Sequence, residues 1–496
     1  MTKKNSTQKA AQQKDAHQKD TQQNEFISTP TKSEEQGKRL RLFGTDGIRG
    51  TANQGAMTPD VVVKVGQAVG HILQNQPLPW VSPNRKVVIG KDTRLSGYMI
   101  EQALASGLNS MGVNVQLVGP LPTPGIGYLT RNMRASAGIV ISASHNAYQD
   151  NGIKIFGHDG FKISDQMERE IEDLVQADQL NSKLPPSSQI GRSRRIEDAQ
   201  GRYIVFVKSS FPDNATLDGL RIVLDTANGA AYKVAAAVFE ELGAEVIHIG
   251  AQPNGININD KVGALYPAKI SDLVLQYRAD LGISLDGDAD RVIMVDEKGQ
   301  VINGDHILGI CALHMKKKGL LKKDTLVCTQ MSNFGLERRM REAGIRVVKT
   351  GVGDKFVVEE MRRGGFNLGG EQSGHIIFLD HTTTGDGCIA ALNMLAVMQE
   401  TGVRMSELNR IIEDVPQVLI NCRVSQRKDL ESIPGYLELV ERIESDLAGE
   451  GRIFVRYSGT EPLIRVLVEG PDRSHIASCA QEIAELLEEH LSNNRR

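Results

Sequence analysis

The chain has 496 residues, of which 40% are hydrophobic, 24% charged and 4% aromatic, and its formal net charge is −3. A chain of this length is too long to fold around one hydrophobic core, which predicts roughly three or four domains. The near-neutral charge argues against nucleic acid or an anionic membrane as a partner. No stretch approaches ~18 consecutive apolar residues and no apolar signal segment opens the chain, so we expect no membrane partner and a cytoplasmic location.

The first 38 residues are almost free of apolar side chains. Such a segment cannot bury enough surface to offset the entropy lost on ordering, so residues 1–38 are expected to form a disordered tail. Directly after it, the run Gly44–Gly50 places three glycines around Asp46 and Arg49. A loop of this kind can bring backbone N–H groups and a guanidinium to an anion, although a plain glycine turn with a surface arginine is the alternative.

One pattern, a strand followed by a helix, a glycine and a second strand, occurs three times. Its first strands are expected at residues 85–90, 220–224 and 325–329, and its glycines are Gly112, Gly243 and Gly344. The repetition predicts three related mixed α/β domains with crossover helices and largely parallel strands. The last ~75 residues instead read as three strands and one amphipathic helix, which predicts a smaller α+β domain. The expected domains are 39–195, 196–300, 301–414 and 415–496.

A polar loop lies between an apolar β-branched run at residues 138–141 and a second short apolar run at 153–156. This pattern predicts a strand, a tight loop and another strand. The loop offers the hydroxyl of Ser144 and the imidazole of His145, and Lys154 follows in the second strand. A hydroxyl beside a base or a cation can act as a nucleophile or a phosphate carrier. An ordinary serine turn accounts for the same residues equally well.

Three acidic residues, Asp286, Asp288 and Asp290, follow the apolar strand expected at 281–285. If the segment is extended, alternate side chains share a face and the three carboxylates converge. Converging carboxylates repel one another unless a cation lies between them, and hard oxygen ligands suit Mg²⁺. An EF-hand is the competing interpretation, but its sixth position would be Arg291 in place of glycine, and the flanking segments read as strands.

Two further loops offer groups that bind sugars and anions. Glu371, Ser373 and His375 occupy alternate positions of a glycine-rich loop and could face the hydroxyls of a sugar ring, although a capped turn is an equal alternative. Near the C-terminus, a loop between two strands offers hydroxyls, N–H donors and two arginines suited to a phosphate. The residues of this second loop are Arg456, Ser458, Gly459, Thr460 and Arg465. Lys355 is a weaker loop candidate.

Taken together and in this order, the four motifs resemble those of the α-D-phosphohexomutase superfamily, over roughly residues 39–491. The resemblance implies four domains around a central cleft, with Ser144 as a phosphoserine. It implies one Mg²⁺ per subunit, held by Asp286, Asp288, Asp290 and the phosphate on Ser144. Other residues match family positions that bind the sugar phosphate or the transferring group. These are Arg49, His145, Lys154, Arg291, Lys355, Glu371, Ser373, His375, Arg456, Ser458, Gly459, Thr460 and Arg465.

Gln372 is typical of the aminosugar branch of the superfamily. The resemblance therefore implies interconversion of glucosamine 6-phosphate and glucosamine 1-phosphate, with glucosamine 1,6-bisphosphate as intermediate and activator, feeding UDP-N-acetylglucosamine and cell-wall precursors. The implied partners are small sugar phosphates. A homodimer is a further possibility that the sequence does not decide. The alternatives are a glucose or mannose mutase, a Mg²⁺-dependent sugar phosphatase and an inactive binding protein. Ala147 and Tyr457 depart from the pattern, where Pro and Lys are usual.

Overall fold

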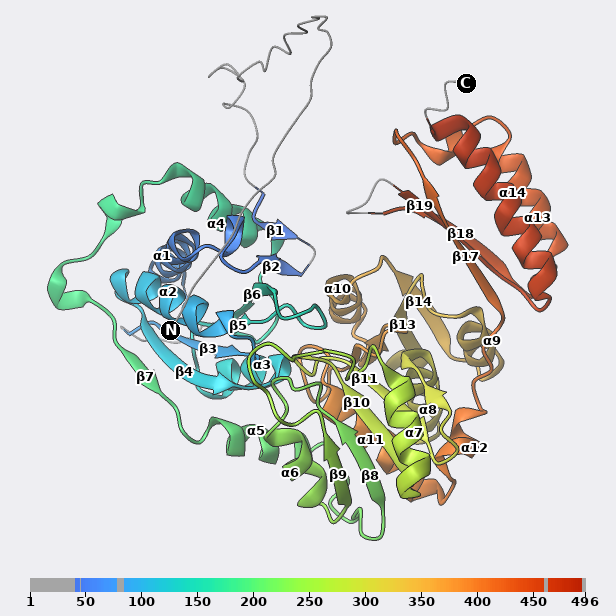
Figure 1. The fold of residues 1–496 in the computed structure, drawn as a ribbon, viewed down its shortest axis with the longest axis horizontal. Coiled ribbons are helices and arrows are strands. Elements are labelled where there is room, and N and C mark those ends of the chain that lie inside the picture. The colour runs from blue at the N-terminus through green and yellow to red at the C-terminus, as the bar shows by residue number, and fades with distance from the viewer. Residues whose placement is uncertain (1–40, 45, 78–83, 459–462, 493–496) are drawn as a thin grey trace, which may run out of the picture. The chain divides into compact units, whose positions relative to one another are not determined.

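The protein is described by a computed structural model over residues 41–44, 46–77, 84–458 and 463–492. Within these residues four β-sheets follow one another along the chain (Figure 1). The expected fold class, three mixed α/β domains and a smaller α+β domain, is confirmed. The tail predicted at residues 1–38 lies outside the described residues, and the four domain boundaries stay predictions. No helix within the described ranges combines the length and apolar character needed to cross a bilayer.

The first sheet mixes parallel and antiparallel pairs. In spatial order its strands are β1 (Phe43–Gly44), β2 (Gly47–Thr51), β6 (Asp150–Gly157), β5 (Ala137–Ile141), β3 (Lys86–Lys91), β4 (Asn114–Pro120) and β7 (Ser193–Arg195). Since alternate side chains face opposite ways, Val87 and Ile89 of β3 enter one core and Val88 enters another. Helices α1 (Pro59–Asn75), α2 (Ser96–Ser110) and α4 (Asp165–Ala177) pack into the first core, and α3 (Thr123–Asn132) packs into the second.

The second sheet has the order β12 (Val301–Ile302), β11 (Val292–Asp296), β10 (Leu281–Leu285), β8 (Arg221–Asp225) and β9 (Glu245–Ile249). Its helices are α5 (Ala199–Lys208), α6 (Val234–Glu240) and α7 (Pro267–Tyr277). Strand β8 pairs in parallel with β9 and β10, whereas β11 runs antiparallel to β10. The chain therefore reverses direction between β10 and β11, at the acidic residues.

The third sheet has the order β14 (Arg346–Thr350), β13 (Thr325–Thr329), β15 (Leu368–Gly370) and β16 (Ile376–Phe378). Its helices are α8 (Gly304–Lys317), α9 (Phe334–Glu342), α10 (Asp354–Gly364), α11 (Gly387–Thr401) and α12 (Met405–Asn409). One continuous hydrophobic core joins residues of all three α/β domains, from Val88 to Ile412. A close-packed core resists deformation, so the loops at the ends of these sheets keep fixed positions.

The fourth sheet is antiparallel, with the order β17 (Gln417–Arg423), β19 (Leu463–Glu469) and β18 (Arg452–Tyr457). Helices α13 (Tyr436–Asp446) and α14 (Arg473–Leu491) pack on it to form a separate core. Polar contacts join this domain to the chain at the start of α9. The Phe334 N–H donates to Glu469 at 3.4 Å, and Arg452 donates to the Ser332 carbonyl. Short 3₁₀ helices cover Gly55–Met57, Leu180–Lys183, Ser187–Gln189, Lys322–Asp324 and Leu430–Ser432.

Helices α1 and α2 cross at two glycines, Gly66 and Gly107. A Cβ on Gly107 would lie 2.3 Å from the Val63 carbonyl oxygen, so Gly107→Ala must push the helices apart. We expect a loss of about 1–3 kcal/mol in unfolding free energy, measured by denaturant titration. The matched control is Gly201→Ala in α5, where a Cβ would meet nothing within 4 Å. That variant should gain about 0.5–1 kcal/mol, and equal losses for both would contradict the packing argument.

Asp305, in the first turn of α8, is fully buried and accepts a hydrogen bond from the Asn333 N–H at 2.8 Å. Burial raises the pKa of Asp305 to about 7, although the Asn333 N–H partly opposes this. The folded protein therefore holds this proton more tightly than the unfolded chain does, and stability falls as the pH rises from about 4 to about 7.

Asp305→Asn removes that dependence. Its melting temperature should exceed that of the parent by roughly 2–4 °C more at pH 8 than at pH 5, measured by scanning calorimetry. The nearby charges, Asp414 and His306, are kept in both proteins. Asp60→Asn in the first turn of α1 is the control, because the pKa of Asp60 is lowered. A gain that is the same at both pH values would rule out the burial effect.

Candidate active site

Ser144 lies in the turn between β5 and β6, the loop and strands that the sequence predicted. Its backbone is left-handed, with φ of 51°, a conformation that costs energy for a residue other than glycine. The side chain is buried, and Oγ donates a hydrogen bond to Asp286 Oδ2 at 2.6 Å. His145 Nδ1 lies 3.3 Å from Ser144 Oγ. The strained turn thus aims the hydroxyl at the acidic residues.

A fully buried arginine, Arg94, holds this turn in place. Its guanidinium donates to four backbone carbonyls, those of Ser144, Asn146, Ala147 and Asp150. Its Nε donates to Asp92 Oδ2 at 2.8 Å, and Ser142 donates to that same oxygen at 2.7 Å. Arg94 is not among the site residues predicted from the sequence. The sequence feature that could have indicated Arg94 is the polar segment Asp92–Arg94. It comes directly after the parallel strand β3, at the edge of the sheet where β5 also ends.

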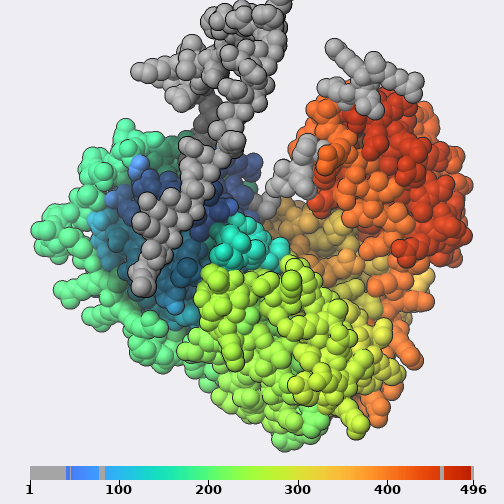
Figure 2. Space-filling model, in the orientation of Figure 1, coloured from blue at the N-terminus to red at the C-terminus, as the bar shows by residue number. Residues whose placement is uncertain are grey.

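The second domain also contacts the Ser144 turn. Asn259 Nδ2 donates to the Ser144 carbonyl at 2.9 Å and to the Asn146 carbonyl at 3.0 Å. Gly287 comes so close that a Cβ there would lie 2.6 Å from the Ser144 carbonyl oxygen. Figure 2 shows the teal segment around the β5–β6 turn directly against yellow-green residues of the second domain. The serine loop and the acidic loop are therefore held as one unit.

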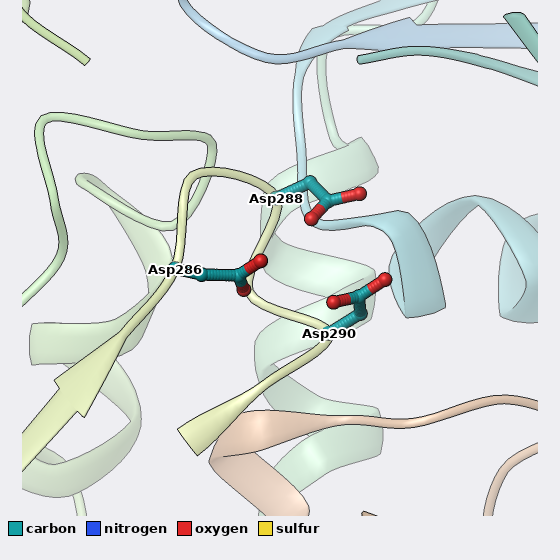
Figure 3. A group of neighbouring side chains, drawn as sticks. All are labelled: Asp286, Asp288 and Asp290. Atoms are coloured by element: carbon teal, nitrogen blue, oxygen red, sulfur yellow. The ribbon is translucent and has the colours of Figure 1, made fainter. Parts of the chain in front are cut away.

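The three aspartates, Asp286, Asp288 and Asp290, point toward one another on the turn between β10 and β11 (Figure 3). One carboxylate oxygen from each lies within 4.8 Å of the others. We expected an extended segment, but the chain forms a tight turn in which Ala289 has φ of 56°. The carboxylates converge because the backbone curls around them. The flanking strands β10 and β11 form an antiparallel pair, which excludes the helical flanks of an EF-hand.

The electrostatics of the three aspartates fit a divalent cation. Burial and the charges of Asp290 and Asp288 raise the pKa of Asp286 well above its usual value. Burial also opposes ionisation of Asp290, but Lys154 and His375 outweigh it and hold the pKa of Asp290 well below the usual range. Asp288 Oδ1 and Asp290 Oδ1 are buried without a hydrogen-bond partner among the described residues. Hard, buried, unpartnered oxygens of this kind suit Mg²⁺.

Cationic groups surround the acidic turn. The Lys154 ammonium lies 3.0 Å from Asp288 and 3.3 Å from Asp290. Burial disfavours this charge, but the neighbouring carboxylates hold the pKa of Lys154 well above its usual value. The Arg291 backbone N–H donates to Asp286 Oδ1 at 3.1 Å. Burial, together with the charges of the two arginines at 291 and 49, lowers the pKa of His145 to about 4.

Thr123, at the start of α3, is a second site residue that was not predicted from the sequence. Its hydroxyl donates to Asp288 Oδ2 at 2.6 Å, and its N–H donates to the Asp288 carbonyl at 3.0 Å. The signal was a Thr-Pro pair that opens a helix directly after strand β4. Thr123 orients one of the three carboxylates, which is the role that partners of metal ligands commonly play.

In the third domain, Glu371 and Ser373 lie together and His375 lies apart from them. Ser373 Oγ donates to Glu371 Oε2 at 3.4 Å, and Glu371 also accepts from the Gly353 N–H at 3.0 Å. The buried His375 instead places Nδ1 3.7 Å from Asp290, and its Nε2 lies 3.1 Å from the Gly385 nitrogen. We expected all three side chains on one side of the loop. The turn at 371–374 directs His375 toward the acidic turn.

The remaining candidates lie in α10 and the fourth domain. Lys355 forms an ion pair with Asp165 of α4. Arg456 of β18 and Arg465 of β19 are direct cross-strand neighbours, and burial together with the Arg465 charge lowers the pKa of Arg456. Two like charges held side by side favour binding of an anion. Ser458 directly follows β18, and its N–H donates to the Leu463 carbonyl. Gly459 and Thr460 lie outside the described residues.

Four sequence models of the phosphoglucomutase/phosphomannomutase family match the chain in order. Domain I covers residues 40–182, domain II 201–299, domain III 303–415 and the C-terminal domain 419–486. A phosphoglucosamine mutase from Bdellovibrio bacteriovorus is 72% identical over 92% of this chain and 100% of its own length. One from Geotalea daltonii is 56% identical over 92% of this chain and 99% of its own length.

Solved structures share the fold at lower identity. A phosphoglucomutase/phosphomannomutase family protein from Burkholderia thailandensis has a TM-score of 0.74 at 22% identity, covering 91% of this chain and 98% of its own. The Aspergillus fumigatus N-acetylphosphoglucosamine mutase, solved with GlcNAc-6P and magnesium, has a TM-score of 0.62 at 18% identity, covering 92% and 97%. The resemblance inferred from the four motifs is confirmed. The chain therefore belongs to the phosphoglucosamine mutases, a family of isomerases within the α-D-phosphohexomutase superfamily.

Proposed function

We propose that this hexosamine phosphate mutase interconverts glucosamine 6-phosphate and glucosamine 1-phosphate by passing a phosphoryl group through Ser144. The observation that carries the proposal is the buried Ser144 hydroxyl, 2.6 Å from Asp286 within a cluster of three converging carboxylates. A serine oxygen that lies beside a cation site and basic side chains suits phosphoryl transfer, which depends on positioning and charge neutralisation. The high identity to phosphoglucosamine mutases supports the aminosugar as substrate.

Asp286, Asp288, Asp290 and a phosphate oxygen on Ser144 would together hold one Mg²⁺. When bound, the ion neutralises charge on the transferring phosphoryl group. The unpartnered oxygens of Asp288 and Asp290 support this assignment, because each has a free position for a cation. Lys154 and Arg49 would contact the equatorial oxygens of the same group, with His145 and Arg291 beside them.

The cycle begins with phosphorylated Ser144. The sugar O1 bonds to phosphorus and loses its hydroxyl proton, while the bond from phosphorus to the serine oxygen breaks. That oxygen gains a proton, so the products are the free Ser144 hydroxyl and a 1,6-bisphosphate. After this intermediate turns over, the Ser144 oxygen bonds to the other phosphoryl group, whose bond to the sugar breaks. Burial of Ser144 supports such a cycle, since access of water would hydrolyse the phosphoserine.

The sugar and its second phosphate need separate contacts. Glu371 and Ser373, which already lie together, are proposed to hold the sugar hydroxyls. Lys355 and His375 are proposed as further contacts of the sugar phosphate. The cross-strand pair Arg456 and Arg465 is proposed to hold the phosphate that is not reacting, with Ser458, Gly459 and Thr460. We also propose a cytoplasmic location and a place before UDP-N-acetylglucosamine synthesis. A homodimer stays a prediction.

Replacing Ser144 tests the central step. Ser144→Ala should lower mutase turnover more than about 10³-fold and abolish a single added phosphoryl group in the intact mass, because the carrier oxygen is gone. Ser209→Ala, an exposed serine in another domain, should keep both. Full activity of Ser144→Ala would exclude the carrier role. Release of free phosphate at the turnover rate would favour a phosphatase, and a higher kcat/KM on glucose or mannose phosphates would favour the other branch.

Thr123→Val removes one hydrogen bond to Asp288 while keeping the side-chain shape. We expect the affinity for Mg²⁺, measured by calorimetric titration, to fall about 10–100-fold, since Asp288 loses the donor that orients it. Thr123→Ser keeps the hydroxyl and should bind Mg²⁺ nearly as the parent does. Unchanged affinity in the valine variant would mean that Thr123 does not orient a ligand.

A further inference from the structure

Asp46 lies among three cations that approach its two oxygens separately. Oδ2 pairs with Arg49 Nη2 and lies 3.2 Å from Lys154 Nζ. Oδ1 pairs with Lys162 Nζ. Burial opposes ionisation, but the three cations hold the pKa of Asp46 well below its usual range, so this group is a carboxylate. One carboxylate thus bridges the two cations assigned to the transferring phosphoryl group and a third cation that the cycle does not use.

Lys162 has a second partner in another domain. Its Nζ donates to Asp354 Oδ2 at 2.6 Å, and Asp354 is the first residue of α10. The two side chains are only 15% and 12% exposed. The backbone at Lys162 forms a bridge with Phe156 of β6, the strand that carries Lys154. Lys162 is therefore fixed at its backbone by the first domain and at its ammonium by the third.

This geometry controls the rotation of the Asp46 carboxylate. A carboxylate on a glycine-rich segment can turn about its side-chain bonds, and a turn would move Oδ2 away from Arg49 and Lys154. With Oδ1 held by Lys162, Oδ2 keeps its direction toward both cations. At distances near 3 Å in a largely buried site, such pairs are strong enough to fix side-chain positions. An error of about 1 Å in a group that contacts the reacting atoms costs up to about 10²-fold in rate.

We propose that Lys162 is a positioning residue, which fixes Arg49 and Lys154 for phosphoryl transfer by holding Asp46, and which Asp354 anchors to the third domain. The proposal rests on the function proposed above for Arg49 and Lys154. It requires that Lys162 act on the chemical step through Asp46. A merely structural ion pair between the two domains would instead affect stability alone.

The test combines Lys162→Met with Asp46→Asn in a double-mutant cycle on kcat, using the full-length enzyme with Mg²⁺. In the parent, Lys162→Met should lower kcat about tenfold or more and change KM less than about threefold. In the Asp46→Asn background, Lys162→Met should lower kcat less than about threefold, because the ion pairs that Asp46 makes with the cations are already lost. Lys162→Arg should recover most of the loss. The same factor in both backgrounds, or unchanged kcat in the parent, would overturn the proposal.

Arg362→Gln is the matched control. Arg362, also in α10, forms a half-exposed ion pair with Asp159 at 3.6 Å and stacks on Phe161, next to Lys162. Its loss breaks a contact between the same two segments without touching Asp46, so kcat should stay within about twofold of the parent. An equal loss of kcat in Arg362→Gln would assign the effect to the contact between segments and overturn the role of Lys162.

A second variant covers the case in which Lys162→Met fails to fold. Asp354→Asn keeps Lys162 paired with Asp46 but removes the anchor, and should lower kcat about threefold to tenfold with little change in KM. Parent-like kcat in that variant would overturn the anchoring role. Ser144→Ala separates this test from the underlying function. If Ser144→Ala is inactive while the Lys162 cycle is additive, only the positioning role fails, whereas an active Ser144→Ala refutes the function itself.

Discussion

Mutual repulsion of three buried carboxylates is the constraint on which the rest of this structure depends. Their ligand oxygens lie within 4.8 Å of one another, where two unit charges repel by roughly 3–4 kcal/mol at an effective dielectric constant of 20. The turn cannot hold all three charges without compensation. The protein supplies donors from several elements: Lys154 from β6, Ser144 from the β5–β6 turn and Thr123 from α3. Burial, together with the charges of Asp290 and Asp288, raises the pKa of Asp286, and a bound cation would offset that repulsion.

The serine turn and the acidic turn hold each other in place. Ser144 occupies a left-handed conformation that a free serine loop would seldom adopt. Arg94 and Asn259 both bind the Ser144 carbonyl, one from the first domain and one from the second. Gly287 permits the contact, because any side chain there would meet the same carbonyl. The continuous core beneath these loops fixes their separation, and this explains how two loops more than a hundred residues apart form one site.

The fold by itself does not decide the substrate. The solved relatives share this architecture at 18–22% identity, although their names assign them to different sugars. The groups that would contact the sugar lie in the third domain, and the close relatives match along the whole of that domain. Glu371 and Ser373 form a polar pair there, while His375 turns away to face Asp290. The third domain thus contributes to both the proposed sugar site and the surroundings of the proposed metal site.

The sequence by itself determined the local pattern. Hydrophobic runs predicted the strands at 281–285 and 325–329 with the bounds that the structure has, because a buried strand is a local feature of apolar, β-branched residues. The spacing of Asp286, Asp288 and Asp290 identified a candidate cation site, although for the wrong backbone conformation. Only the tertiary structure decided which residues from elsewhere complete the site. Arg94, Thr123 and Lys162 carry no motif, and each acts through contacts with residues that lie between 50 and 192 positions away. Such contacts depend on how three domains share a core, and no local pattern of residue types encodes that arrangement.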